Sequence, residues 1–315
     1  LDRSSAASDL YKRQLVKVEY PEVLGTTAPP ANKAELRTRG WEVSVKWNDR
    51  IGNDFSYDLG FILSDSQAEI TKYENPSGTL SDYYVGQKIG EIWGYETEGF
   101  YQSDTDVQNH ADQSKLGANW APGDIMYKDL DGNKKINNGS NTLDDHGDLK
   151  VIGNTTPRYQ YGITANMSYK NVYLNVFFQG IGKRDFWPSS QPFWPVATQY
   201  YNTQKWFVTD SWSEDNRDAY FARPIARETK NQQKQTKYLQ DASYCRLKNL
   251  TVGYDFPKSW LSFLHVAKAG VYFSAENLFE FTNVKGAYDP EAAGKNGTMV
   301  YPFQRTYSFG LNVTF

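Results

Sequence analysis

The sequence has few of the residues on which several large classes of protein depend. Cys245 is the only cysteine among 315 residues, so no intrachain disulfide can form and a cysteine-based metal site has no support. No apolar run reaches the roughly 18 residues that a transmembrane helix needs, which excludes a helical membrane protein. Lysine and arginine number 34 against 37 aspartates and glutamates, and this net charge of -3 argues against nucleic acid as a partner.

No catalytic constellation is present either. The three histidines, His110, His146 and His265, are far apart in the chain, and the sequence has no H-E-x-x-H, no G-x-S-x-G and no glycine-rich phosphate loop. Asp289 and Glu291 form a close acidic pair. We interpret this pair as solvated, because paired carboxylates in a polar loop usually are. We therefore predict that the protein is not an enzyme.

Aromatic residues, by contrast, are abundant, and at the end of the chain they alternate with small polar residues. Tyr, Phe and Trp make up 16% of a chain whose mean hydropathy is only -0.69. In residues 305–315, RTYSFGLNVTF, every second residue is apolar, which places the apolar side chains on one face of a strand. A half-buried strand of a soluble protein would show the same alternation. We favour a strand of an outer-membrane barrel, because such barrels alternate in this way and the chain stops on an aromatic residue.

Seven further segments resemble strands, and the connections between them differ sharply in length. The connections 74–155 and 187–242 are very long, whereas 48–54 and 170–171 are short, and 257–267 is a short helical or irregular turn. A transmembrane barrel has short turns on one side and long loops on the other. The sequence therefore predicts an all-β, transmembrane antiparallel β-barrel, with both long loops on the side opposite to the short turns and the C-terminus. The eight predicted strands are residues 9–20, 35–47, 55–73, 158–170, 172–180, 244–256, 268–279 and 305–315.

The alternation also assigns the two faces of the barrel wall. We expect an apolar set to face lipid, namely Tyr159, Ile163, Met167, Tyr307, Phe309, Leu311, Val313 and Phe315. We expect an intervening polar set to face the lumen, namely Gln160, Thr164, Asn166, Thr306, Ser308 and Asn312. Lumen-facing side chains this small would leave a closed eight-stranded barrel underfilled, and they suit a wider barrel. We therefore predict that the first and last strands do not pair with each other but with strands outside this sequence.

Several motifs follow one another in an order that resembles a known family. They are PPANKAELRTRGWEVSVKW, WAPGDIMYKDLDGNKKI, VIGNTTPRYQYGI, VFFQGIGKRD, YCRLKNLTVGYDFP, SAENLFEFTN, YDPE and YPFQRTYSFGLNVTF. In this order they resemble the C-terminal barrel portion of the SusC/RagA family of TonB-dependent outer-membrane transporters, over nearly the whole chain. The resemblance implies that residues 1–315 form about eight strands, the C-terminal third of a barrel of about 22 strands. No plug domain is expected in this chain.

The same resemblance implies a function and partners. The function would be TonB-dependent import of oligosaccharides or peptides by the SusC-like, multi-pass channel of a SusCD complex in the outer membrane of a Gram-negative bacterium. The implied partners are a SusD-like surface lipoprotein, the remaining plug and barrel segments of the same transporter, TonB through the absent N-terminal parts, and outer-membrane lipid. The alternative is a self-contained β-barrel, or a surface module that binds glycans without transport.

One segment in the first long loop begins like an EF-hand calcium loop. In DLDGNKKI, residues 129–136, oxygen ligands are expected at Asp129, Asp131 and Asn133. Lys134 stands where glycine is usual, and a serine stands where the bidentate glutamate belongs. Three aspartates nearby could replace it, namely Asp144, Asp145 and Asp148. The segment is therefore either a calcium site or a turn-forming loop without metal.

Aromatic side chains in the long loops are the candidates for substrate binding. Trp93 and Tyr95 lie in the first long loop, and Trp187, Phe193 and Trp194 lie in the second. These rings could stack on sugars or hold a peptide. They could equally fasten the loops together, because large loops need internal hydrophobic clusters to be ordered.

Overall fold

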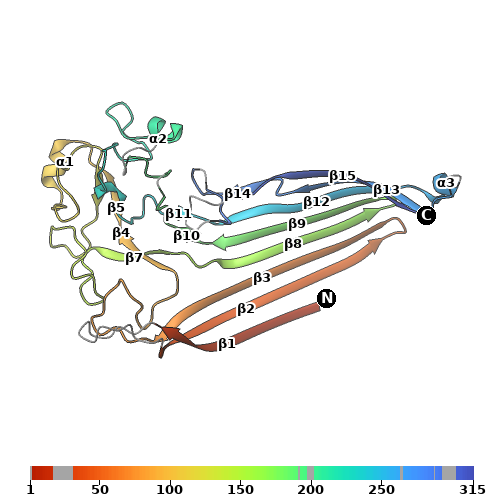
Figure 1. The fold of residues 1–315 in the computed structure, drawn as a ribbon, viewed down its shortest axis with the longest axis horizontal. Coiled ribbons are helices and arrows are strands. Elements are labelled where there is room, and N and C mark those ends of the chain that lie inside the picture. The colour runs from red at the N-terminus through yellow and green to blue at the C-terminus, as the bar shows by residue number, and fades with distance from the viewer. Residues whose placement is uncertain are drawn as a thin grey trace.

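Eight antiparallel strands form one open sheet (Figure 1). The structure, a computed structural model, describes residues 2–16, 31–190, 192–196, 202–262, 265–286, 288–292 and 303–315. The strands of the sheet are β1 (Asp2–Val16), β2 (Ala31–Ile51), β3 (Phe55–Lys72), β8 (Arg158–Tyr169), β9 (Val172–Lys183), β12 (Tyr244–Asp255), β13 (Lys268–Glu276) and β15 (Thr306–Thr314). They pair in that order, and the short β14 (Glu280–Thr282) pairs with β12. All eight predicted strands are present, and the predicted all-β fold class is confirmed.

The alternating side chains lie in register across the sheet. Phe61 pairs with Ile163, and Phe273 pairs with both Val252 and Phe309. Cross-strand partners project to the same face of a sheet, so these residues belong to one continuous apolar face. The opposite face is mostly polar, and small residues meet in four of its pairs: Ser56 with Ser168, Gly60 with Thr164, Thr251 with Ser274, and Ser274 with Ser308.

Glycines on the polar face allow tyrosine rings to lie across the neighbouring strand. Gly253 pairs directly with Tyr173, and Gly310 pairs directly with Tyr272. A Cβ atom added at Gly253 would lie 2.1 Å from the Tyr173 ring, and one at Gly310 would lie 2.2 Å from the Tyr272 ring. Any larger residue would displace these rings, because closely packed side chains leave no room for an added Cβ atom. Packing therefore explains why glycine stands at these points of the alternating pattern.

The connections between strands differ at the two ends of the sheet. The turns between β2 and β3 and between β8 and β9, together with α3 (Lys258–Leu261) and the C-terminus, lie at one end (Figure 1). The described parts of 74–155 and 187–242 lie together at the other end. This arrangement confirms the predicted sorting of the loops. None of the helices in the described part of the chain has the length and apolar character needed to cross a membrane.

The sheet does not close on itself. Strands β1 and β15 occupy its two edges, and among the described strands each pairs only with its inner neighbour. This confirms the prediction that the first and last strands do not pair with each other. A closed eight-stranded barrel is therefore not the fold of the described chain.

The described residues of 74–155 and 185–242 fold together into what we term the loop domain. Its short strands pair as β4 (Glu91–Tyr95) with β7 (Leu149–Asn154), β5 (Thr97–Phe100) with β6 (Ile125–Tyr127), and β10 (Asp185–Phe186) with β11 (Gln240–Asp241). Its helices are α1 (Asp104–Asn109), α2 (Lys205–Thr209) and the 3₁₀ turn η2 (Lys230–Gln232).

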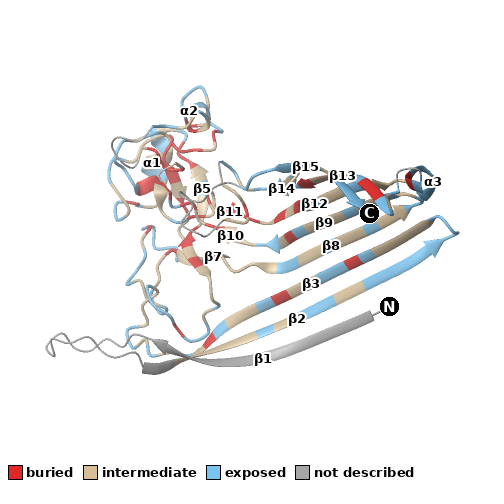
Figure 2. Cartoon of the chain, turned by 45° about the vertical axis from the view of Figure 1, so that its right-hand side comes forward, coloured by how far each residue is buried: buried red, intermediate tan, exposed pale blue. Residues whose placement is uncertain are grey.

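The main buried core lies in the loop domain and not in the sheet. Figure 2 shows most of the buried segments in the loop domain, whereas the strands of the sheet are largely intermediate or exposed. The core contains aromatic residues from both long loops, among them Phe100, Tyr127, Phe221 and Tyr238. The two loops therefore stabilise each other through a shared apolar core.

A candidate binding site in the loop domain

Strand β4 places two of the predicted aromatic residues beside a cavity. Trp93 pairs with Val151 of β7, and Tyr95 pairs with Leu149. The backbone N–H of Tyr95 also donates to the carbonyl oxygen of Lys234 at 2.8 Å, which joins the first long loop to the second. The cavity has a volume of about 520 Å³ and is lined by Trp93, Gly94, Tyr95, Lys115, Leu116, Asn138, Leu149, Trp187, Gln232, Gln233 and Lys234. It therefore lies between the two loops.

The aromatic walls of this cavity are held in place by their neighbours. The indole Nε1 of Trp93 donates to the hydroxyl of Tyr84 at 3.0 Å, and that hydroxyl donates to Glu91 at 2.6 Å. The ring of His146 lies 5.5 Å from that of Trp93. These contacts fix the orientation of the indole before any ligand arrives, which lowers the entropy cost of binding.

Tyr95 brings an unused polar group to the cavity wall. Its side chain is only 4% exposed, and its hydroxyl forms no hydrogen bond with any described residue. Burial, together with the nearby carboxylate of Asp148, raises the pKa of Tyr95 to about 12. The hydroxyl therefore stays protonated at neutral pH and keeps its capacity to donate and accept a hydrogen bond.

The other two predicted aromatic residues, Phe193 and Trp194, are not part of the cavity lining. Phe193 and Trp194 are 1% and 8% exposed, and their rings are 4.8 Å apart. The Phe193 ring also lies 5.3 Å from Phe221 and 6.1 Å from Tyr238. The structure thus brings Trp93, Tyr95 and Trp187 to the cavity, although Tyr95 also belongs to the aromatic core, and it places Phe193 and Trp194 in that core, outside the cavity lining. The rings of Trp187 and Trp194 lie 6.0 Å apart, so the cavity adjoins the core.

The calcium-like segment folds as a tight loop around its own carboxylates. Asp129 accepts hydrogen bonds from the backbone N–H groups of Gly132 and Lys134, both at 2.8 Å. Lys134 has φ +61°, so it adopts the left-handed conformation that glycine would supply. Carboxylate oxygens of Asp129, Asp131 and Asp148 lie within 4.8 Å of one another. This donor set fits a hard cation such as calcium.

Asp148 is the aspartate that joins this group. It is fully buried, and it accepts hydrogen bonds from the N–H groups of Leu130 and Asn137 at 2.8 and 2.9 Å. Asp145 is used differently, because it accepts the hydroxyl of Ser140 at 2.6 Å. The Asn133 oxygen accepts the N–H of Lys135 at 2.7 Å. Asp148 therefore ties the loop together whether or not a metal binds.

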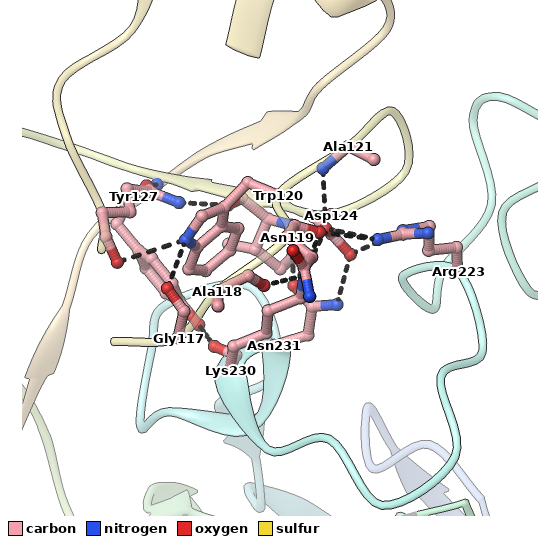
Figure 3. A network of polar contacts seen from close by, with 12 residues as sticks. Gly117, Ala118, Asn119, Trp120, Ala121, Asp124, Tyr127, Arg223, Lys230 and Asn231 are labelled. Atoms are coloured by element: carbon pink, nitrogen blue, oxygen red, sulfur yellow. Dashed lines mark hydrogen bonds and ion pairs between the residues drawn. The ribbon is translucent and has the colours of Figure 1, made fainter. Parts of the chain in front are cut away.

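A buried ionic network, which the sequence did not reveal, clamps the two long loops together (Figure 3). Asp124 is 0% exposed and accepts hydrogen bonds from Nε and Nη2 of Arg223 at 2.8 and 2.9 Å. Its carboxylate also lies 2.9 Å from Nζ of Lys230, and it accepts from Asn231 at 2.9 Å and from the N–H of Ala121 at 3.0 Å. Five donors thus converge on one carboxylate. Burial alone would raise the pKa of Asp124, but the hydrogen bonds from Arg223, Asn231 and Lys230 outweigh it and hold this pKa below its ordinary value.

Lys230 completes the clamp from the second loop. Its side chain is 2% exposed, and its Nζ donates to the carbonyl oxygens of Ala118 and Asn119 at 2.9 and 2.8 Å. The same Nζ lies 4.8 Å from the centre of the Trp120 ring. The contacts of this buried ammonium group are therefore with residues of the first loop.

A second buried cation anchors the last loop, the connection between β14 and β15, to the sheet. Arg246 on β12 is 1% exposed, and its guanidinium donates to Asp289 at 2.7 Å and to Glu291 at 2.9 Å. Lys248 also lies 2.7 Å from Glu291. The prediction that Asp289 and Glu291 are merely solvated is therefore wrong. They neutralise Arg246 and Lys248, which project from β12. The arginine within this strand-like run was the sequence signal that could have indicated the pairing.

Comparison with known proteins connects this architecture to one group of receptors. No family model matches the sequence. TonB-dependent receptor P3 of Formosa agariphila is 29% identical over 94% of this chain and 30% of its own length. TonB-dependent receptor SusC of Bacteroides thetaiotaomicron is 24% identical over 90% of this chain and 27% of its own length.

A solved structure shows the same fold. The structure of the RagAB peptide transporter superposes with a TM-score of 0.71 at 21% identity, covering 99% of this chain and 33% of that chain. The chain thus spans about a third of the length of the proteins it matches. By name these proteins are receptors and transporters rather than enzymes, in agreement with the prediction. The resemblance found in the sequence is therefore confirmed, and the chain is an all-β barrel segment related to the TonB-dependent receptors that include SusC.

Proposed function

We propose that this chain forms part of the wall and mouth of a TonB-dependent outer-membrane transporter that imports oligosaccharides or peptides. Because the chain spans about a third of its relatives, this activity belongs to the whole receptor and not to the segment alone. The segment contributes a stretch of wall, the β sheet, and a stretch of external surface, the loop domain.

The open sheet is the observation that carries this proposal. Strands β1 and β15 leave both edges unpaired among the described strands, although apolar cross-strand pairs such as Phe61 with Ile163 form a band across one face of the sheet. In hydrocarbon, every backbone N–H and C=O must find a partner. The two edges therefore pair with further strands of the same receptor, and the small polar residues of the other face line a lumen wide enough for a plug.

The same observation weighs against a self-contained eight-stranded barrel. Such a barrel requires β1 and β15 to pair, and they lie at opposite edges of the described sheet. A surface module without transport activity has no need for an apolar face of this extent, which in water would favour aggregation.

The proposal includes the partners that such a receptor needs. Its energy comes from TonB, acting through parts of the receptor outside this chain. A SusD-like surface lipoprotein covers the mouth next to the loop domain. The names of one relative, SusC, and of one structural neighbour, the RagAB peptide transporter, support an importer of this type.

Uptake measurements in the native host test the proposal. The gene that encodes the complete receptor is deleted, and the uptake of fluorescently labelled oligosaccharide and peptide mixtures is measured with and without an uncoupler of the proton-motive force. We expect the deletion and the uncoupler each to abolish uptake of one mixture, and we expect the wild-type gene to restore it. Uptake that is unchanged by the deletion, or that persists in the uncoupled cells, would show that the proposal is wrong.

A further inference from the structure

The cavity between the two long loops carries positive charge without a matching negative group. Two of its lining residues are lysines, Lys115 from the first loop and Lys234 from the second, and none is an aspartate or glutamate. Neither ammonium group forms a salt bridge with a described residue, and both side chains are exposed. Lysines that line a cavity without a carboxylate in its lining attract an anion.

Two carboxylates that are close in sequence to lining residues, Glu96 and Asp112, already have partners. Glu96 lies 3.0 Å from Nζ of Lys128 and also pairs with Lys150. Asp112 accepts the N–H and the hydroxyl of Ser114 at 2.9 and 3.0 Å. The hydrogen bonds from Ser114 and, to a smaller extent, the charges of Lys135 and Lys115 lower the pKa of Asp112, so this carboxylate offsets part of the charge of Lys115. No described carboxylate lies within salt-bridge distance of Lys234, so its charge remains available to a ligand.

The rest of the cavity wall suits a ring that carries hydroxyl groups. The indoles of Trp93 and Trp187 supply flat apolar faces, against which the C–H bonds of a sugar ring can pack. The amides of Asn138, Gln232 and Gln233 both donate and accept hydrogen bonds, as sugar hydroxyls require. The volume of about 520 Å³ lies within the range of small-molecule sites.

The strand edge of β4 is already paired where it meets the second loop. One edge of β4 pairs with β7. On its other side, the N–H of Tyr95 donates to Lys234 at 2.8 Å, and the N–H of Thr236 donates to the carbonyl of Tyr95 at 3.1 Å. Extended peptides are commonly recognised by strand addition. Near Tyr95 the cavity therefore offers side-chain contacts and no unpaired strand edge.

We propose that this cavity is a binding site for acidic oligosaccharides, whose carboxylate or sulfate groups contact Lys115 and Lys234 while their rings pack on Trp93 and Trp187. This inference rests on the proposed import function and specifies the class of solute that the receptor recognises.

Titration calorimetry of the complete receptor in detergent tests the inference with matched probes. Tetragalacturonate is the acidic probe, and its methyl ester is the neutral counterpart of the same shape. A sulfated carrageenan tetrasaccharide distinguishes sulfate from carboxylate, inorganic sulfate tests for an anion site without sugar recognition, and tetraglutamate tests for an acidic peptide.

We expect at least one acidic saccharide to bind, and to bind more weakly as salt rises. Lys115→Met combined with Lys234→Met should weaken this binding by about tenfold or more, without changing the weak binding of the methyl ester. Trp187→Ala should weaken binding of both saccharides. The control, Lys205→Met with Lys268→Met, removes the same charge away from the cavity and should change nothing. The amount of each variant that stays folded is checked by its heat-modifiable migration in detergent gels.

Each contrary outcome overturns the inference. These outcomes are unchanged affinity in the cavity double variant, equal binding of tetragalacturonate and its ester, tighter binding of tetraglutamate, binding of inorganic sulfate alone, or no binding of any probe. The proposed function is judged separately by uptake. If energised uptake of another solute persists in these cases, only the substrate class is wrong, whereas absence of any energised uptake refutes the function itself.

Discussion

Replacing Asp124 by asparagine should unlock the loop domain while leaving the barrel wall intact. The carboxylate is fully buried, and it neutralises both Arg223 and Lys230 at distances of 2.8 to 2.9 Å. Asparagine keeps the size of the side chain but leaves the ammonium group of Lys230, itself 2% exposed, without its countercharge. Removing one partner of a buried ion pair typically costs about 3–5 kcal/mol. Since each 1.4 kcal/mol is a factor of about ten, the open form of the loop domain should become roughly a hundredfold to a few thousandfold more populated.

Native-state hydrogen exchange measures this change at individual segments. The backbone N–H groups of Ile125 and Tyr127 donate to the side chains of Asn231 and Gln113 in the closed loop domain, and they should exchange faster by that factor in Asp124→Asn. Amides of β9 and β12 should not change. The control is Lys128→Met, which removes an exposed pair with Glu96 and should cost less than about 1 kcal/mol. Equal exchange in Asp124→Asn and the control would refute the view that this network holds the two loops together.

Three further results are expected. The pKa of Asp124 is lowered in the folded protein, so its carboxylate stabilises the loop domain above the unfolded value of about 3.9, and this stabilisation is lost as pH falls through the folded pKa. Hydrogen exchange in the loop domain should therefore accelerate below about pH 4 in the wild type but not in Asp124→Asn. Phe309→Lys, on the apolar face, should reduce the free energy of folding in the membrane by about 2–4 kcal/mol and lower the amount of folded receptor in outer-membrane fractions. Ser308→Lys, one residue away on the opposite face, should not, and equal loss in both variants would contradict the assignment of faces. Arg246→Met removes the countercharge of Asp289 and leaves Glu291 with Lys248 alone; limited proteolysis should then cut the connection between β14 and β15 faster, and unchanged cleavage would argue against this anchor.

The wall could be predicted from the sequence because its signal is local. Alternation with period two fixes which side chains share a face, and this pattern does not depend on distant residues. The strand ends were less accurate. Strand β2 was predicted at 35–47 but spans Ala31–Ile51, because pairing continues through polar partners such as Asn48 with Asp58 and Arg50 with Ser56. For β1, predicted at 9–20 and observed at Asp2–Val16, residues 17–20 lie outside the described residues.

The loop domain could be predicted only in part, because its signals are distant in sequence. Trp187 and Phe193 belong to one aromatic motif, yet one lines the cavity and the other is buried in the core. No local pattern distinguishes them. Asp124 and Asn231 are 107 residues apart, and Lys234 of the cavity lies between Lys230 and Lys237 in an aperiodic stretch, where nothing local distinguishes it from them. Such positions acquire their roles only when the two loops fold against each other.

The shared core of the loop domain has a consequence for the order in which the molecule assembles. Strand order in the sheet follows chain order, so each new hairpin can add to a growing edge without threading. The aromatic core, however, requires Phe221 and Tyr238 from the second loop, which follow β8 and β9 in the chain. The first loop therefore cannot complete its core until two further strands, β8 and β9, have been synthesised. The contacts that offset the entropy cost of closing this loop thus form late. We expect the strands up to β9 to pair in register before the loop domain becomes rigid, so that the sheet folds before the loop domain.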